Sequence, residues 1–127
     1  MTLSEALYTH ISTESNVAAL QSTRFYPQFL PQKPTYPAST YRIVSMVPWQ
    51  SRDDKNFMRA RVQIDCYATT HLAVTGLAEA MHDAMVAYTK ASNPRVVEVQ
   101  LANRTDTFDG ETEAHRASAD FFVWFEQ

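Results

Sequence analysis

Apolar and polar side chains alternate along the middle of the chain. Between Phe57 and Ala68 every second residue is apolar, including Val62, Ile64 and Cys66, and most of the residues between them are polar. A repeat of two predicts a β-strand with one buried face and one wet face, as in an antiparallel sheet solvated on one side. We therefore expect a strand over Phe57–Ala68, at or near the centre of the sheet, with these three side chains buried.

Helical spacing of apolar residues marks two other segments. Leu3, Leu7 and Ile11 lie four residues apart, which predicts a helix over residues 3–13. A second helix is expected over residues 71–90. Its apolar stripe consists of Ala73, Leu77, Met81, Ala84, Met85 and Tyr88.

Capping signals support the first helix. Thr2 and Glu5 have the spacing of a capping box, in which each side chain accepts a hydrogen bond from the backbone N–H of the other. A short helical turn is expected to follow over residues 16–21, with Ser15 as its cap.

Four more segments are rich in the β-branched and aromatic residues that favour strands. They are residues 24–27, 39–47, 96–103 and 114–125. The resulting order is α-β-β-β-α-β-β within a single domain over residues 1–127. The simplest architecture for that order is an α+β fold, a mainly antiparallel sheet of about four strands with two helices packed on one face.

Two polar segments between the strands carry charges of opposite sign. Residues 48–56 and 104–113 are expected to be long loops, and long loops often carry function. The first, together with the start of the next strand, has a basic excess, whereas the second has an acidic excess. The charged residues of these segments are candidates for a subunit or partner interface. They are Arg52, Asp53, Asp54, Lys55, Arg59, Arg61, Asp106, Asp109, Glu111 and Glu113.

Composition narrows the class of protein. The 127 residues are 45% hydrophobic and 20% charged, as in an ordinary globular domain. A net charge of −3 argues against a dedicated nucleic-acid-binding protein, which carries a basic surface. Cys66 is the only cysteine, so neither an intrachain disulfide nor a cysteine zinc site is expected. No signal peptide or membrane-spanning segment is expected either.

The sequence lacks an assembled catalytic or metal-binding motif. Gly76 and Gly110 are the only glycines, which is too few for a phosphate-cradling loop. Glu79 and His82 have the spacing of a di-iron ligand pair, but a second pair is missing, so a solvated helix face is the better interpretation. His115 is best explained as a polar residue at a strand edge. We expect no enzymatic activity, cofactor or metal.

Four short motifs nevertheless occur in an order that indicates a known family. They are Arg24-Phe25-Tyr26-Pro27, then Tyr36-Pro37 with Tyr41-Arg42-Ile43, then Arg59-Ala60-Arg61-Val62-Gln63-Ile64-Asp65-Cys66-Tyr67-Ala68, and finally Asp120-Phe121-Phe122-Val123-Trp124. Together they span nearly the whole chain. In this combination the chain resembles the tail-completion, or tail-terminator, proteins of siphophages and gene-transfer particles.

The resemblance implies a non-enzymatic virion protein. It implies a ring, of six subunits, that caps the tail tube and joins it to the head-completion and neck proteins, with DNA passing through the lumen without sequence-specific binding. Assembly in the host cytoplasm and no contact with a membrane are implied too. Two alternatives remain open from the residues alone. One is a head-side neck or connector protein, and the other is a small dimeric α+β ligand-binding protein.

The opposite charges of the two polar segments suggest how such a ring assembles. If each subunit presented its basic segment to one neighbour and its acidic segment to the other, the contact would be head-to-tail. The competing interpretation is that both segments are solvated loops without partners.

Overall fold

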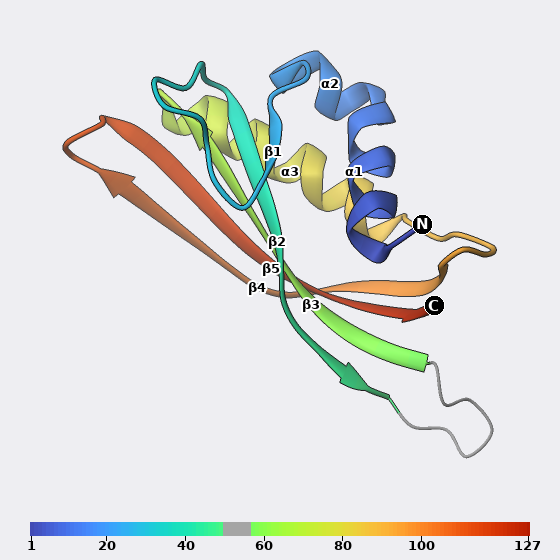
Figure 1. The fold of residues 1–127 in the computed structure, drawn as a ribbon. Coiled ribbons are helices and arrows are strands. Elements are labelled where there is room, and N and C mark those ends of the chain that lie inside the picture. Colours follow the sequence, from blue (N-terminus) through green and yellow to red (C-terminus); the bar gives the residue numbers. More distant parts are fainter. Residues whose placement is uncertain (50–56) are drawn as a thin grey trace.

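A computed structural model of the chain describes residues 1–49 and 57–127. It confirms the α+β class, with three helices and a five-stranded sheet (Figure 1). The elements in chain order are α1 (Leu3–Thr13), α2 (Ser15–Gln21), β1 (Phe25–Pro27), β2 (Ala38–Pro48), β3 (Phe57–Ala68), α3 (His71–Val86), β4 (Arg95–Asp109) and β5 (Ala114–Glu126).

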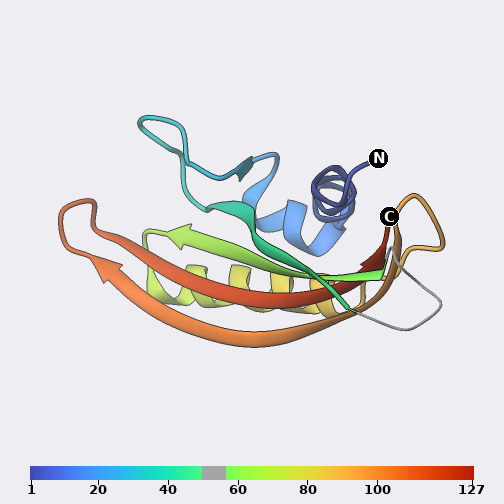
Figure 2. The same ribbon diagram turned by 60° about the horizontal axis from the view of Figure 1, so that its bottom comes forward.

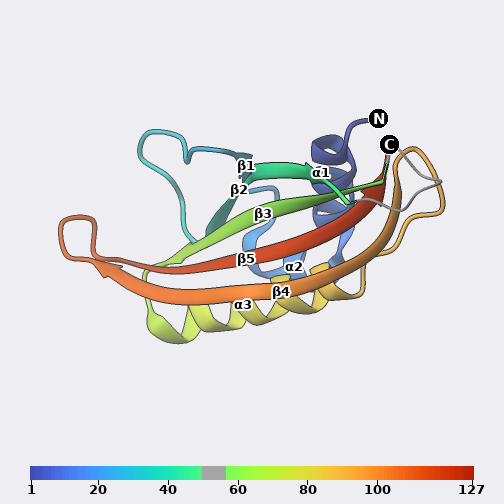
Figure 3. The ribbon, with the colours of Figure 1, turned by 90° about the horizontal axis from the view of Figure 1, so that it is seen from below.

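The sheet has the strand order β1-β2-β3-β5-β4, which can be followed in Figure 3. β1 pairs with β2 in parallel, and the other three pairings are antiparallel. β3 therefore lies in the middle, as its alternation predicted. Its buried side chains Val62, Ile64 and Cys66 are at most 2% exposed.

The helices cover the face of the sheet to which these side chains point. α3 runs along β3, β5 and β4 (Figure 2), and α1 and α2 pack against it. The core between the layers is filled by large apolar side chains of α1, α3 and β5, which removes their surface from water. Its largest fully buried members include Leu3, Leu7, Leu77, Met81, Phe121 and Phe125. Within the described parts of the chain, no helix has the length and apolar character needed to cross a membrane.

The N-terminal helix has the expected bounds and capping box. The Glu5 N–H donates to Thr2 Oγ1 at 3.1 Å, and the Thr2 N–H donates to Glu5 Oε1 at 3.3 Å. The prediction that Ser15 caps the next turn is wrong. α1 and α2 follow each other directly, so Glu14 ends one helix and begins the other, without a side-chain cap bond, and Ser15 is the first residue of α2.

The second predicted helix is too long by four residues. α3 ends at Val86, because the chain turns there to bury Tyr88 against the N-terminal helix. The Tyr88 ring stacks on His10 at 4.0 Å, and its hydroxyl donates to the Ala6 carbonyl. Lys90 then bridges to Val96 in antiparallel fashion, which starts the return to the sheet.

The predicted loop over residues 104–113 is also wrong. Residues 104–109 continue β4, which pairs with β5 as far as Asp109 opposite Ala114. Only the turn over residues 110–113 remains. A polar segment can extend this strand because β4 is an edge strand, and polar and charged side chains there stay in water.

We expect the Ile64→Ala variant to lose about 2–5 kcal/mol of unfolding free energy, because it leaves a cavity in the middle of the core. Chemical denaturation followed by circular dichroism measures this loss. Val97→Ala, on an exposed part of the sheet edge, is the control and should change stability by less than about 0.5 kcal/mol. An Ile64→Ala loss no larger than that of the control would contradict the assigned burial.

Burial of Cys66 makes stability depend on pH. Burial raises the pKa of the Cys66 thiol from 9.0 to about 12, because the thiolate is poorly solvated in the core. Between these values only the unfolded chain loses the thiol proton, so the folded state loses relative stability as the pH rises. At pH 10 this loss should be about 1.4 kcal/mol.

We expect Cys66→Ala to be less stable than the native protein at pH 8 but to lose less stability between pH 8 and pH 10. Denaturation curves at both values for the two proteins isolate the thiol from the tyrosines, which titrate in both. Parallel pH dependences would show that the thiol does not ionise differently in the two states.

Candidate functional site

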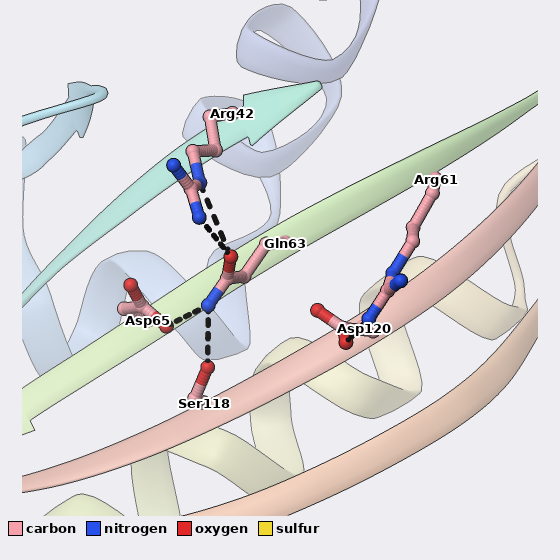
Figure 4. Close-up of polar contacts among 6 residues, drawn as sticks. All are labelled: Arg42, Arg61, Gln63, Asp65, Ser118 and Asp120. Atoms are coloured by element: carbon pink, nitrogen blue, oxygen red, sulfur yellow. Dashed lines mark hydrogen bonds and ion pairs between the residues drawn. The ribbon is translucent and has the colours of Figure 1, made fainter. Parts of the chain in front are cut away.

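The sheet face opposite the helices carries a ladder of polar contacts across β2, β3 and β5 (Figure 4). Gln63 lies at its centre. Its Oε1 accepts from Arg42 Nη2 at 2.7 Å, and its Nε2 donates to Ser118 Oγ at 2.8 Å and to Asp65 Oδ1 at 3.3 Å. One amide thus connects three strands, which favours a single register among them.

Two ion pairs continue the ladder. Arg61 contacts Asp120 at 2.6 Å, and Arg116 contacts Asp65 at 2.9 Å. Both carboxylates are only 13% exposed, whereas both arginine side chains are more than 40% exposed. Ion pairs with one exposed partner are worth little individually. Their effect here is to satisfy two carboxylates that the sheet has partly desolvated.

An arginine held between aromatic rings occupies the other part of this face. The Arg59 guanidinium lies 4.7 Å from the Trp49 ring centre and 4.4 Å from that of Phe122. Trp124 meets the Trp49 ring edge-on at 6.0 Å. Stacking of this kind is favourable for arginine and holds its charge at a fixed place, near the last residues of β2 and the first residues of β3.

The structure places the candidate interface residues at opposite ends of the sheet. Arg59 and Arg61 lie near the start of β3, at the end where Phe57 pairs with Glu126. Asp106 and Asp109 lie at the far end of β4, and Glu111 and Glu113 lie in the turn that follows. Figure 1 shows this turn at one end of the sheet and the C-terminus at the other. The other four candidates, Arg52, Asp53, Asp54 and Lys55, lie outside the described residues.

The separation between the two charged groups follows from the register. Asp109 pairs with Ala114 on β5, and the next residue of β5, His115, pairs with Ala68 on β3. Asp109 is therefore level with a position one residue beyond Ala68. Arg59 is therefore about ten residues away along the strand direction, or roughly 33 Å at the usual rise per residue. The described members of the two groups therefore do not contact each other within one chain, so an attraction between them requires a second copy.

The sequence did not single out the partners in the ladder. Arg42, Arg116, Ser118 and Asp120 were not among the candidates, although they hold Gln63, Asp65 and Arg61 in place. Alternation places residues such as Gln63 on the wet face. Which residues lie opposite them depends on strand order and register, which a single sequence does not reveal.

The described residues hold no cluster of side chains that could bind a metal ion. No three histidine, cysteine or acidic side chains gather within residues 1–49 and 57–127 in a way that could hold an ion. Buried Cys66, with its raised pKa, is a poor nucleophile. An open cleft of about 560 Å³ lies at the turn end of the sheet, between Tyr36, Tyr67 and Arg116. Its arginine already pairs with Asp65.

Comparisons with known proteins identify a family and a solved structure with the same fold. The family described as "Tail completion protein gp17" matches residues 5–126. Among solved structures, a chain of "Virion of native gene transfer agent (GTA) particle" has the same fold, with a TM-score of 0.83. The two chains are 17% identical, and the match covers 98% of this chain and 95% of that one. No curated protein sequence matches the chain.

Proposed function

The chain belongs to the tail completion protein gp17 family, and from this membership we propose that it forms a ring that caps the tail tube and joins it to the head–neck complex. Membership itself makes it a structural protein of a phage-type tail. The observation that carries the proposal is that the family match spans nearly the whole chain, residues 5–126. The position at the head-proximal end of the tail and the contacts with tube and neck proteins are parts of the proposal.

A hexamer is the proposed ring size. A compact domain of 127 residues has a radius of gyration of about 14 Å and hence a diameter of roughly 36 Å. Six such bodies in contact leave a central hole about as wide as one of them, and B-DNA is roughly 20 Å across. The hole of a trimer or tetramer would be too narrow, whereas a pentamer or a hexamer lets DNA pass, and the resemblance to tail-terminator proteins favours six. A net charge of −3 agrees with a lumen that does not hold DNA tightly.

Opposite charge at the two ends of the sheet supports a head-to-tail contact between subunits. The basic group is Arg52, Lys55, Arg59 and Arg61, and the acidic group is Asp106, Asp109, Glu111 and Glu113. Because the described members lie at opposite ends of one sheet, a subunit can offer each group to a different neighbour. Such a heterologous contact closes into a ring when the rotation between subunits is right.

The alternatives are less well supported. A head-side neck or connector protein would also form a ring, but the family match names tail completion. A dimeric ligand-binding protein needs a pocket with convergent polar groups. The cleft beside Arg116 is open, and its arginine is paired with a carboxylate.

We expect the double variant Arg52→Glu/Lys55→Glu to assemble less well than the native chain at low salt, because the proposed contact would then join like charges. The difference should shrink as ionic strength rises, since the Debye length falls from about 30 Å at 0.01 M to about 10 Å at 0.1 M. Light scattering coupled to size exclusion measures the ring, and electron microscopy of tails measures capping.

The control is a compensating change in the same chain. Adding Asp109→Lys/Glu111→Lys should restore part of the lost assembly, because the attraction returns with both signs exchanged. Failure of this fourfold variant to recover would show that the two charged groups do not face each other. A native protein that stays dimeric and never caps tails would refute the ring itself.

A further inference from the structure

Two strand segments lie in the sheet with one edge unpaired and with side chains exposed on both faces. On β2, pairing with β1 stops at Tyr41, so residues 43–48 form a free edge among the described parts of the chain. On the opposite side of the sheet, β4 is an edge strand: among the described residues it pairs with β5 and, at Val96, bridges to Lys90. From residue 103 to residue 109 all but one of its residues are exposed.

These two edges carry exposed apolar side chains. On β2 they are Val44, Met46 and Val47, each about 40% exposed, and on β4 the most exposed is Phe108, at 57%. Natural sheets usually protect free edges with bulges, charges or cover, because an open apolar edge pairs readily with another strand. The part of β4 before residue 103 is protected in this way, since both of its register shifts lie there. Residues 103–109 keep a regular register, although they carry Arg104, Asp106 and Asp109, and the β2 edge has one register shift, between Ile43 and Ser45.

We propose that in neighbouring subunits the β2 edge (residues 43–48) of one copy pairs with the β4 edge (residues 103–109) of the next, so that the sheet continues across the contact. This inference rests on the proposed ring and specifies the surface that builds it. The partner is a second copy of this chain, because the two edges suit each other in direction and in charge.

The strand directions fit without adjustment. Along the sheet, β2, β3, β5 and β4 alternate in direction, so β2 and β4 run in opposite senses. If the next copy is added in the same orientation, its β2 therefore lies antiparallel to β4 and continues the alternation. Antiparallel ladders of this kind form from short segments.

Charge complementarity favours this same placement. Asp109 pairs with Ala114, which lies two residues before Arg116 on β5. Side chains two residues apart on a strand point to the same face, so Asp109 lies on the helix-free face together with Arg59 and Arg61. When residues 43–48 of one copy lie beside residues 103–109 of another, Arg59 and Arg61 of the first copy lie on β3, the strand next to the β2 segment that makes the contact. They then come within reach of Asp109, whereas Asp106, opposite the buried Ala117, lies on the helix side of the sheet.

The offset between the two edges matches that of a closed sheet. Met46 is level with Ala60, and Asp106 is level with Cys66, so the edges differ by six residues, or about 20 Å along the strands. Four strands span roughly 19 Å across the sheet. A step of about 20 Å along the strands for every 19 Å or so across them tilts the strands by about 45° from the ring axis. Strands of closed barrels are tilted by roughly 35–45°. The offset also places β1 of the next copy past Asp109, the last residue of β4, and beside the β4–β5 turn.

Paired cysteines test the contact directly. Val44→Cys is combined in one chain with Asn103→Cys, Thr105→Cys or Thr107→Cys, in three separate variants, and the protein is oxidised under assembly conditions. Disulfides need Cα atoms about 4.4–6.8 Å apart, so only residues nearly opposite each other can bond. We expect at least one variant to give a ladder of covalent oligomers up to the size of the ring.

The single variants and a misplaced pair serve as controls. Each single cysteine should give no ladder, because the contact joins different surfaces, and native Cys66 is buried. Val44→Cys with Leu72→Cys, at a residue 84% exposed on α3, should give none either. If rings of normal mass form but no paired variant gives more covalent oligomers than this control, the edge pairing is wrong while the ring itself stands. A native chain that forms no ring and caps no tail would overturn both.

Lysine substitutions give an independent measurement. Met46→Lys and Phe108→Lys should each raise the protein concentration needed for half-assembly by roughly tenfold or more, because a lysine blocks an edge. Val97→Lys lies on the same strand, in its bulged part, and should change that concentration by less than about twofold. Melting temperatures verify that each variant is folded. A Val97→Lys effect as large as that of Phe108→Lys would contradict the proposal.

Discussion

The pairing of β3 with β5 is the constraint on which the rest of the structure depends. It runs without a register shift from Phe57 opposite Glu126 to Ala68 opposite His115. A slip of one residue would turn every core side chain to the wet face. On the helix side, burial of Val62 and Phe121 penalises that slip. On the open face, Gln63, Asp65 and Asp120 penalise it as well, because their partners would be lost and partly buried carboxylates would stand unpaired.

This double constraint explains how one sheet face stays ordered without helices over it. Each polar contact of the ladder adds little stability, but together they accept only one register. A sheet fixed in this way presents its edges and ends at constant positions. For the ring subunit proposed above, which would fit against copies of itself, fixed edges matter more than a pocket.

The sequence predicted those elements whose signals are local. The alternation in Phe57–Ala68 and the Thr2–Glu5 box correctly gave a central strand and a capped helix. The failures depend on distant partners. α3 stops early because Tyr88 packs on His10, 78 residues before it in the chain, and residues 104–109 are a strand because β5 lies beside them. The candidate charges were chosen by sign, and their arrangement at two opposite ends could not be inferred before the register was known.

The position of the two free edges limits the kinds of assembly that are possible. The free part of β2 and the edge of β4 lie on opposite sides of the sheet and face away from each other. One neighbour placed on a flat continuation of the sheet cannot occupy both edges. A subunit that uses both therefore needs two neighbours, and repeated contacts of that kind produce either a closed ring or an open filament. Only closure leaves no unpaired edge at the end of the assembly. The strand tilt set by the edge offset is what would decide between them, because it fixes the rotation from one copy to the next.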